Sequence, residues 1–226
     1  MYQVVKSLTF KECVEEAFGM DAEKRILRFL QEEELAGFED DSARGRYLLE
    51  RCTQWRRQFL LWEDNTYIDG IHGWNLNMSV YKLRLPEMND WTIYLYRMTL
   101  LAVVSGMSVG ERNCLAVGWR NFSTVADDYY VNGDYVSLTR EQWLKELNSL
   151  VEQSWEKYQR FPGTSSAYHR EMEKNYPKFN SILDDLAQNI KACEVVRMNQ
   201  FGGDDTIWYF VKTLDCFYLL SLSDSM

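Results

Sequence analysis

The segment that begins at Thr139 constrains the fold more than any other part of the sequence. Thr139-Arg140-Glu141-Gln142 has the S/T-x-x-E/Q form of a capping box, in which two side chains bond the exposed N–H groups at a helix start. Apolar and aromatic residues then recur every three or four positions, at Trp143, Leu147, Leu150, Val151, Trp155 and Tyr158. We therefore predict a helix from Thr139 to just before Pro162, with this face turned to a core.

The same spacing recurs through much of the chain. It predicts further helices over residues 21–36, 41–62, 74–85, 90–104, 108–117, 123–130, 165–175 and 177–198. Residues 63–73 are rich in Asn, Asp and Gly and predict a loop. Residues 204–222 fit a helix, although their aromatic and β-branched content also suits a strand, and we expect the helix.

The predicted fold class is therefore mainly α. We expect a single helical array of about eight to ten helices, with short C-terminal strands as the alternative for the last segment. One domain spans residues 1–226 in this interpretation, and residues 132–137 are the best place for a subdivision.

Composition excludes several classes of protein. With 46% hydrophobic and 15% aromatic residues, the chain can bury a core and is not intrinsically disordered. A net charge of −9 argues against a general nucleic-acid binder, which needs a basic surface. The longest apolar runs, Leu100–Val104 and Cys216–Leu220, are far shorter than the roughly 20 residues that cross a bilayer. The N-terminus has no apolar signal sequence, so we expect a cytoplasmic protein that does not bind membranes.

The residue types that carry catalysis or bind metals form no recognisable motif. The five cysteines are widely spaced without a C-x-x-C pair, which predicts reduced and mostly buried thiols. His72 and His169 are the only histidines and lie in no H-x-x-x-H pattern. The pair Asp184-Asp185, like the other paired acids, would diverge by about 100° on a helix and is typical of a solvated surface. We assign no catalytic residue, no metal ligand and no cofactor.

Charge is distributed unevenly near the N-terminus. Residues 21–41 hold eight acids and three bases, whereas residues 44–57 hold five arginines and one glutamate. One interpretation is a pair of antiparallel helices whose charges complement each other. The other is an acidic docking face for a basic partner, with loop aromatics as anchors. The predicted partner-binding residues are Glu32, Glu33, Glu34, Glu39, Asp40, Asp41, Tyr67, Asp127, Asp128, Asp134 and Tyr135.

Residues 90–135 resemble a known family. The resemblance is carried by Asp90-Trp91, Arg97, Gly106-Met107-Ser108, Glu111, Phe122-Ser123, Tyr130, Gly133 and Tyr135. These residues are similar to a pattern in the YbeU/YbeR-like family of uncharacterised bacterial proteins, although the order of Trp and Asp is reversed and Thr124 replaces a Trp of that pattern. The resemblance covers about a fifth of the chain. It implies an α-helical fold and supplies no catalytic residues.

These patterns favour a non-enzymatic protein-binding module. Its most concrete form is a bacterial immunity or inhibitor protein that neutralises a toxin by occluding its basic active-site surface. The first alternative is a hydrolase or transferase whose site combines acids with His72 or His169. The second is a scaffold subunit that associates with itself.

Overall fold

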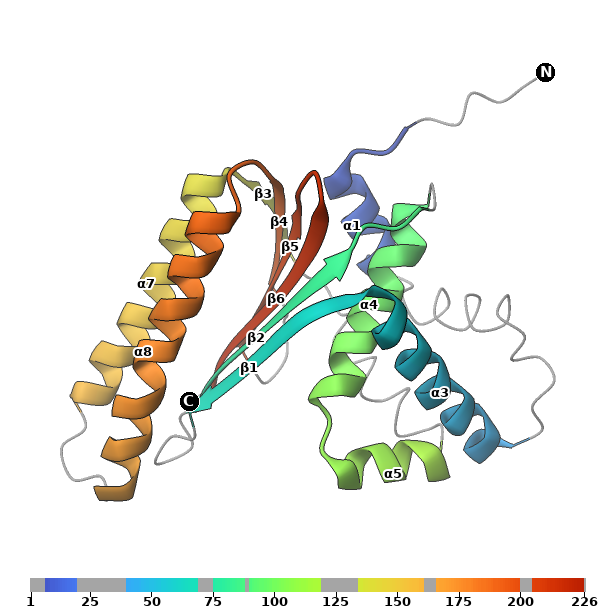
Figure 1. Ribbon diagram of the computed structural model, residues 1–226, viewed down its shortest axis with the longest axis horizontal. Coiled ribbons are helices and arrows are strands. Elements are labelled where there is room, and N and C mark those ends of the chain that lie inside the picture. Colours follow the sequence, from blue (N-terminus) through green and yellow to red (C-terminus); the bar gives the residue numbers. More distant parts are fainter. Residues whose placement is uncertain are drawn as a thin grey trace. The chain divides into compact units, whose positions relative to one another are not determined.

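The chain forms two compact units. The computed structural model describes residues 7–19, 40–68, 75–87, 90–118, 134–160, 166–199 and 205–225 (Figure 1). Unit 1 comprises Met1–Leu60 and Pro86–Tyr135, and unit 2 comprises Leu61–Leu85 and Val136–Met226. The second segment of unit 1 is therefore inserted in the chain between two parts of unit 2.

Unit 1 is helical in its described part. Its helices are α1 (Phe10–Phe18), α3 (Asp41–Phe59), α4 (Trp91–Gly106) and α5 (Val109–Val117). Each begins at a side chain that accepts a hydrogen bond from the first turn: Thr9 and Ser108 in capping boxes, and the carboxylates of Asp40 and Asp90. The sequence-predicted helices over 41–62, 90–104 and 108–117 are thus confirmed, except that α3 ends at Phe59.

Helix α4 forms the centre of unit 1. Nearly every side chain from Tyr94 to Val104 is buried, because α1 and α3 both pack against this helix. Aromatic rings join the three helices, since Phe10 of α1 lies edge-on to Trp91 and Phe59 of α3 lies edge-on to Tyr94. No single helix in the described part of the chain has the length and apolarity to span a bilayer; α4 and α5 meet that test only jointly, and they are bent by 119° at the break between them.

The unit 1 core includes a thiol whose ionisation is suppressed. Cys52 of α3 is buried, and this burial raises the pKa of its thiol to about 12. All five cysteines lie within the described residues and are free; Cys13, Cys52 and Cys216 are buried and Cys114 is exposed.

Alkaline pH is therefore expected to destabilise unit 1 through Cys52. Above pH 9 the unfolded thiol loses its proton while the folded thiol keeps it, so the free energy of unfolding falls as pH rises toward about 12. The measurement is the urea midpoint at a series of pH values from 7 to 10 in a reducing buffer. Cys52→Ala is the control, because it lowers stability at every pH but removes this part of the slope. Equal slopes in the two proteins would contradict the prediction.

Helices α3 and α5 approach each other unusually closely. A Cβ atom placed on Gly45 of α3 would lie 1.9 Å from the carbonyl oxygen of Leu115 in α5. Three residues earlier, the hydroxyl of Ser42 donates to the carbonyl oxygens of Ala116 at 3.1 Å and Val117 at 2.9 Å. The first turn of α3 thus bonds the last carbonyls of α5, which have no partner within their own helix.

Unit 2 is built on a six-stranded sheet. Its strands are β1 (Leu60–Ile68), β2 (Asn75–Arg84), β3 (Tyr135–Leu138), β4 (Glu194–Asn199), β5 (Asp205–Lys212) and β6 (Cys216–Ser225). They lie in the order β1-β2-β6-β5-β4-β3, and β6 pairs antiparallel with both β2 and β5. Helices α7 (Arg140–Gln159) and α8 (Ser166–Asn189) lie side by side over one face of the sheet (Figure 1).

The core of unit 2 lies between these two helices and the sheet. Helix α7 contributes Trp143, Leu147 and Val151, and α8 contributes an apolar stripe from Phe179 to Leu186, which Ile190 continues just after the helix. The sheet contributes Met78, Val80, Val195, Tyr209, Val211, Tyr218, Leu220 and Leu222, which alternate along their strands. The intervening side chains on the other face are also apolar and buried; they include Tyr81, Leu83, Val196, Met198, Trp208, Phe210, Phe217 and Leu219.

The prediction of a mainly α fold with eight to ten helices is wrong, because the chain combines helices with a six-stranded antiparallel sheet. The expected helices over 74–85 and 204–222 are strands, and the expected loop over 63–73 begins with most of β1. The expected helix over 177–198 ends at Asn189 and is followed by β4. Since both faces of the sheet are apolar, runs such as Ile207–Val211 lack the polar–apolar alternation that indicates a strand.

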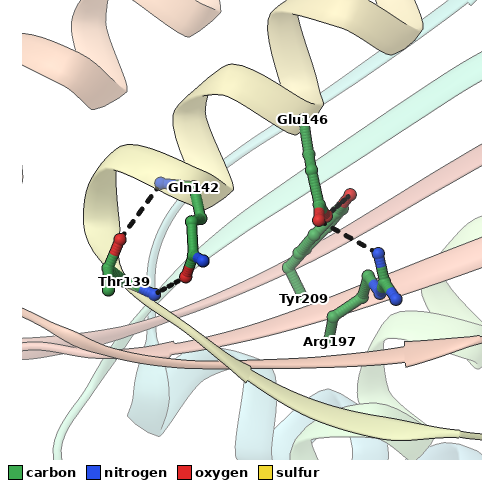
Figure 2. A network of polar contacts seen from close by, with 5 residues as sticks. All are labelled: Thr139, Gln142, Glu146, Arg197 and Tyr209. Atoms are coloured by element: carbon green, nitrogen blue, oxygen red, sulfur yellow. Dashed lines mark hydrogen bonds and ion pairs between the residues drawn. The ribbon is translucent and has the colours of Figure 1, made fainter.

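The capping box that opened the helix prediction is confirmed. The backbone N–H of Thr139 donates to Oε1 of Gln142 at 2.8 Å, and the N–H of Gln142 donates to Oγ1 of Thr139 at 3.2 Å (Figure 2). The predicted helices over 21–36 and 123–130 lie outside the described residues. The proposed pairing of acidic residues 21–41 with basic residues 44–57 likewise falls mostly on residues that the structure does not describe.

Candidate functional site

A polar cluster fastens α7 to the sheet. Arg197 of β4 and Tyr209 of β5 are directly paired across the strands, on the face that α7 covers. Glu146 of α7 accepts from both: its Oε1 lies 3.0 Å from Nη1 of Arg197, and its Oε2 lies 3.4 Å from the hydroxyl of Tyr209 (Figure 2). Burial first, and then the charge of Glu146, raise the pKa of the Tyr209 phenol, so it stays a proton donor.

This cluster has the geometry of a structural lock. Both carboxylate oxygens of Glu146 are engaged, and its side chain and that of Arg197 are only 31% and 25% exposed. Such a charge-assisted contact holds one helix at one register on two strands. The cluster therefore positions α7.

A second lock joins α7 to α8. Arg140, the first residue of α7, donates from Nε to the carbonyl oxygen of Ile190 and from Nη2 to that of Ala187 at 2.5 Å. These carbonyls belong to the C-terminal end of α8, where arginine satisfies unpaired acceptors and complements the helix dipole. The two locks make α7 and α8 a rigid pair on the sheet.

The outer side of α8 carries an open surface depression. It is lined by Tyr176, Pro177, Asn180, Ser181, Asp184, Asp185 and Gln188. These positions recur every three or four residues and therefore form a stripe along one side of the helix, opposite the buried side chains from Phe179 to Ile190. The depression is thus a feature of a single rigid helix.

The two carboxylates in the depression only accept hydrogen bonds, whereas its hydroxyl and amide side chains can both donate and accept. The carboxylate of Asp185 is held in place by Nδ2 of Asn189 at 2.7 Å. Among the described residues, no side chain bonds or pairs with the exposed carboxylate of Asp184. Pro177 lies inside the helix and has no N–H to donate to the carbonyl oxygen of Glu173. The surface therefore offers negative charge and acceptors to a ligand that brings donors.

An aromatic pair supports one end of the depression. The ring of Tyr176 is stacked on Trp155 of α7, with centroids 4.3 Å apart and an angle of 19° between the planes. Both residues are half-buried, so the rings hold a fixed orientation while part of their surface stays accessible. The stack thus gives the depression an apolar, electron-rich end beside its acidic end.

The structure describes only some of the predicted partner-binding residues. Glu32, Glu33, Glu34, Glu39, Asp127 and Asp128 lie outside the described residues, as does the side chain of Tyr67, whose backbone belongs to β1.

The others are partly engaged in local structure. Asp40 accepts from the N–H of Ala43 at 2.7 Å as the cap of α3, and Asp41 pairs with Arg44 at 3.3 Å. Asp134 is exposed. Tyr135 lies at the start of β3 and not in the expected loop, and its hydroxyl donates to the carbonyl oxygen of Phe18 at 2.6 Å.

The sequence interpretation placed Asp184 and Asp185 on an ordinary solvated helix face. A signal was available in the polar residues Asn180, Asp184 and Gln188, which repeat every four positions on the side opposite the apolar stripe. His72 lies outside the described residues, as does the side chain of His169. Within the part of the chain that the structure describes, no group of three or more His, Cys, Asp or Glu side chains is arranged to hold a metal ion.

Comparison with known proteins adds no relative. No protein-family model, no curated protein and no solved structure matches this chain.

Proposed function

We propose that this chain is a non-enzymatic protein-binding module that docks a basic partner in the depression on α8. The observation that carries the proposal is the combination of an acceptor-lined hollow, an aromatic end and a rigid two-helix support. Its most concrete form is an immunity or inhibitor protein that covers the basic active-site surface of a toxin. The five free thiols fit a reducing compartment, so we propose that it acts in the cytoplasm.

Electrostatics gives this surface a role in finding the partner. The carboxylates of Asp184 and Asp185 are exposed, and the whole chain carries a net charge of −9. Complementary charge raises the rate of encounter and suppresses acidic competitors, while the aromatic end supplies contact area. Lysine and arginine side chains of the toxin that are bound in this way can no longer contact the substrate of the toxin. Occlusion would inhibit the toxin for this reason.

The test is a charge reversal in the depression with a matched reversal elsewhere. Asp184→Lys changes the charge by two units at a side chain that has no intramolecular partner among the described residues. Glu50→Lys makes the same change on the exposed side of α3, in unit 1. The partner to be measured is the product of a neighbouring gene, or a protein that the immobilised full chain retains from its native host, titrated by calorimetry at low and high salt.

We expect Asp184→Lys to weaken binding about tenfold or more, mainly through a slower association, and to reduce the salt dependence. Glu50→Lys is expected to leave the affinity within about twofold of the parent. The proposal is wrong if no protein partner is found, or if the two reversals weaken binding equally.

A further inference from the structure

We infer that the depression on α8 recognises a partner segment that carries two arginine side chains, one at its aromatic end and one at its acidic end. This inference rests on the proposed function and names the chemistry of the partner. It follows from the aromatic stack, from the acceptors, and from the distance between them.

The aromatic end favours arginine over lysine. Both cations are attracted to an aromatic face, but a guanidinium group is planar and weakly hydrated, so it stacks on the ring more favourably than the compact, strongly hydrated ammonium of lysine. Tyr176 is held by its stack on Trp155 and is half-buried, so a guanidinium that contacts the accessible part of this side chain meets a group already fixed in place. Among the described residues, Arg97 lies 5.5 Å from the ring centre of Trp55 and Arg51 lies 5.3 Å from that of Tyr47, while one lysine, Lys82, lies 5.6 Å from that of Tyr218.

The acidic end also matches a guanidinium. Its acceptors are Asp184 and the side-chain oxygens of Asn180, Ser181 and Gln188, which surround the carboxylate one turn before and one turn after it. Arginine presents five N–H groups in a rigid fork and can bond a carboxylate with two of them while others reach neighbouring acceptors. Lysine supplies three donors from a single point and cannot span such a set.

The spacing of the two ends sets the spacing of the two arginines. Tyr176 and Asp184 are eight residues apart on α8, which corresponds to about 12 Å along the helix axis. An extended segment rises about 3.3 Å per residue, so side chains four positions apart on one face are about 13 Å apart. An Arg-x-x-x-Arg segment in extended conformation therefore reaches both ends.

The experiment titrates the full chain with synthetic peptides whose termini are blocked. The first contains Arg-x-x-x-Arg in a Gly/Ser background, the second contains Lys-x-x-x-Lys, and the third contains two adjacent arginines. Binding is followed by calorimetry and by the chemical shifts of the Trp155 and Tyr176 rings. We expect the first peptide to bind at least about fivefold tighter than either of the others.

Two substitutions separate stacking from charge. Tyr176→Leu is expected to remove the preference for arginine but to leave a weaker binding of all basic peptides. Tyr176→Phe is expected to keep the preference for arginine, because the aromatic ring remains. Asp184→Lys is expected to weaken all three peptides. Far-ultraviolet circular dichroism of each variant confirms that α8 is intact.

The outcomes distinguish the inference from the function on which it rests. Equal binding of the arginine and lysine peptides, or an unchanged preference in Tyr176→Leu, overturns the arginine assignment. If the protein partner still responds to Asp184→Lys in that case, the proposed docking surface stands. If neither the partner nor the peptides respond to Asp184→Lys, both proposals fail.

Discussion

Replacing Gly45 by alanine is expected to lower the free energy of unfolding of unit 1 by about 3 kcal/mol. The new methyl carbon would lie 1.9 Å from the carbonyl oxygen of Leu115, which is backbone and has no rotamer in which to escape. Helix α3 must then move away from α5, and the bonds from Ser42 to the end of α5 are lost with the contact. The gain in helix propensity, about 1 kcal/mol at most, offsets only part of this cost.

The matched control is Gly110→Ala in α5. A Cβ there meets nothing nearer than Oγ of Ser108 at 3.8 Å, an ordinary contact, so alanine is expected to be neutral or to stabilise by up to about 1 kcal/mol. Urea unfolding followed by circular dichroism measures both variants. If the two alanines have equal effects, α3 and α5 do not pack as closely as described.

Trp143→Ala is expected to cost about 3–5 kcal/mol in the stability of unit 2. Trp143 is 0% exposed and lies in the core between α7 and the sheet, one turn before Glu146. Truncation of the side chain leaves a large cavity. The polar contacts of Arg140 and Glu146 hold α7 in place, so the helix cannot shift toward the sheet to fill this cavity. The expected loss is large enough to unfold a marginally stable unit at 37 °C, and thermal unfolding by near-ultraviolet circular dichroism will show it.

Phenylalanine at the same position is the informative control. The buried Nε1–H of Trp143 meets no acceptor among the described residues, so its removal gives up no hydrogen bond. Trp143→Phe is therefore expected to cost about 1–2 kcal/mol, the price of lost ring volume alone. A cost close to that of alanine would show that the indole N–H has an acceptor and that its loss matters.

The sequence predicts those helices that begin at a recognisable capping residue and carry apolar side chains at regular spacing. Thr139 and Gln142 form the expected capping box, and Asp90 and Ser108 cap α4 and α5. These signals are local, because each depends on residues within one or two turns. The sequence also predicts helix over most of residues 166–189, but as two helices divided before Pro177. In the structure Pro177 lies inside one continuous helix.

The strands escaped prediction because their periodicity is ambiguous and part of their pairing is distant in the sequence. Residues 74–85 do alternate, with Leu76, Met78 and Val80 separated by polar side chains. This pattern is so short that the apolar positions also fit one face of a short helix. Residues 205–212 and 216–222 are apolar on both faces, and a buried strand of this kind cannot be told from a buried helix by periodicity. What decides them is strand pairing. The pairing of β5 with β6 is local, but the pairing of β6 with β2 joins segments far apart in the sequence and lies in no single window.

The candidate site was predictable only in part. The acidity of the chain predicts a basic partner, and this remains a prediction. The predicted partner-binding acids are those that lie most densely along the sequence. Most of those acids lie outside the described residues. We propose Asp184 and Asp185 on the ground of surface shape, because Tyr176 and Pro177 line the same depression on one helix. The resemblance to the YbeU/YbeR-like family likewise stays a prediction.

The position of β6 has a consequence for how the protein is made. β6 lies between β2 and β5, and its register joins Asn75 to Ser225 and Arg84 to Cys216. Closing so long a loop is entropically costly and slow, whereas the contacts of unit 1 and of the α7–α8 pair are closer in sequence. While the chain is being synthesised, the edge of β2 that pairs with β6 therefore stays unpaired until long after the helices of unit 1 have been made. The period of greatest risk of aggregation thus falls before residue 216 is added, and chaperones that shield extended apolar segments would act on residues 75–84.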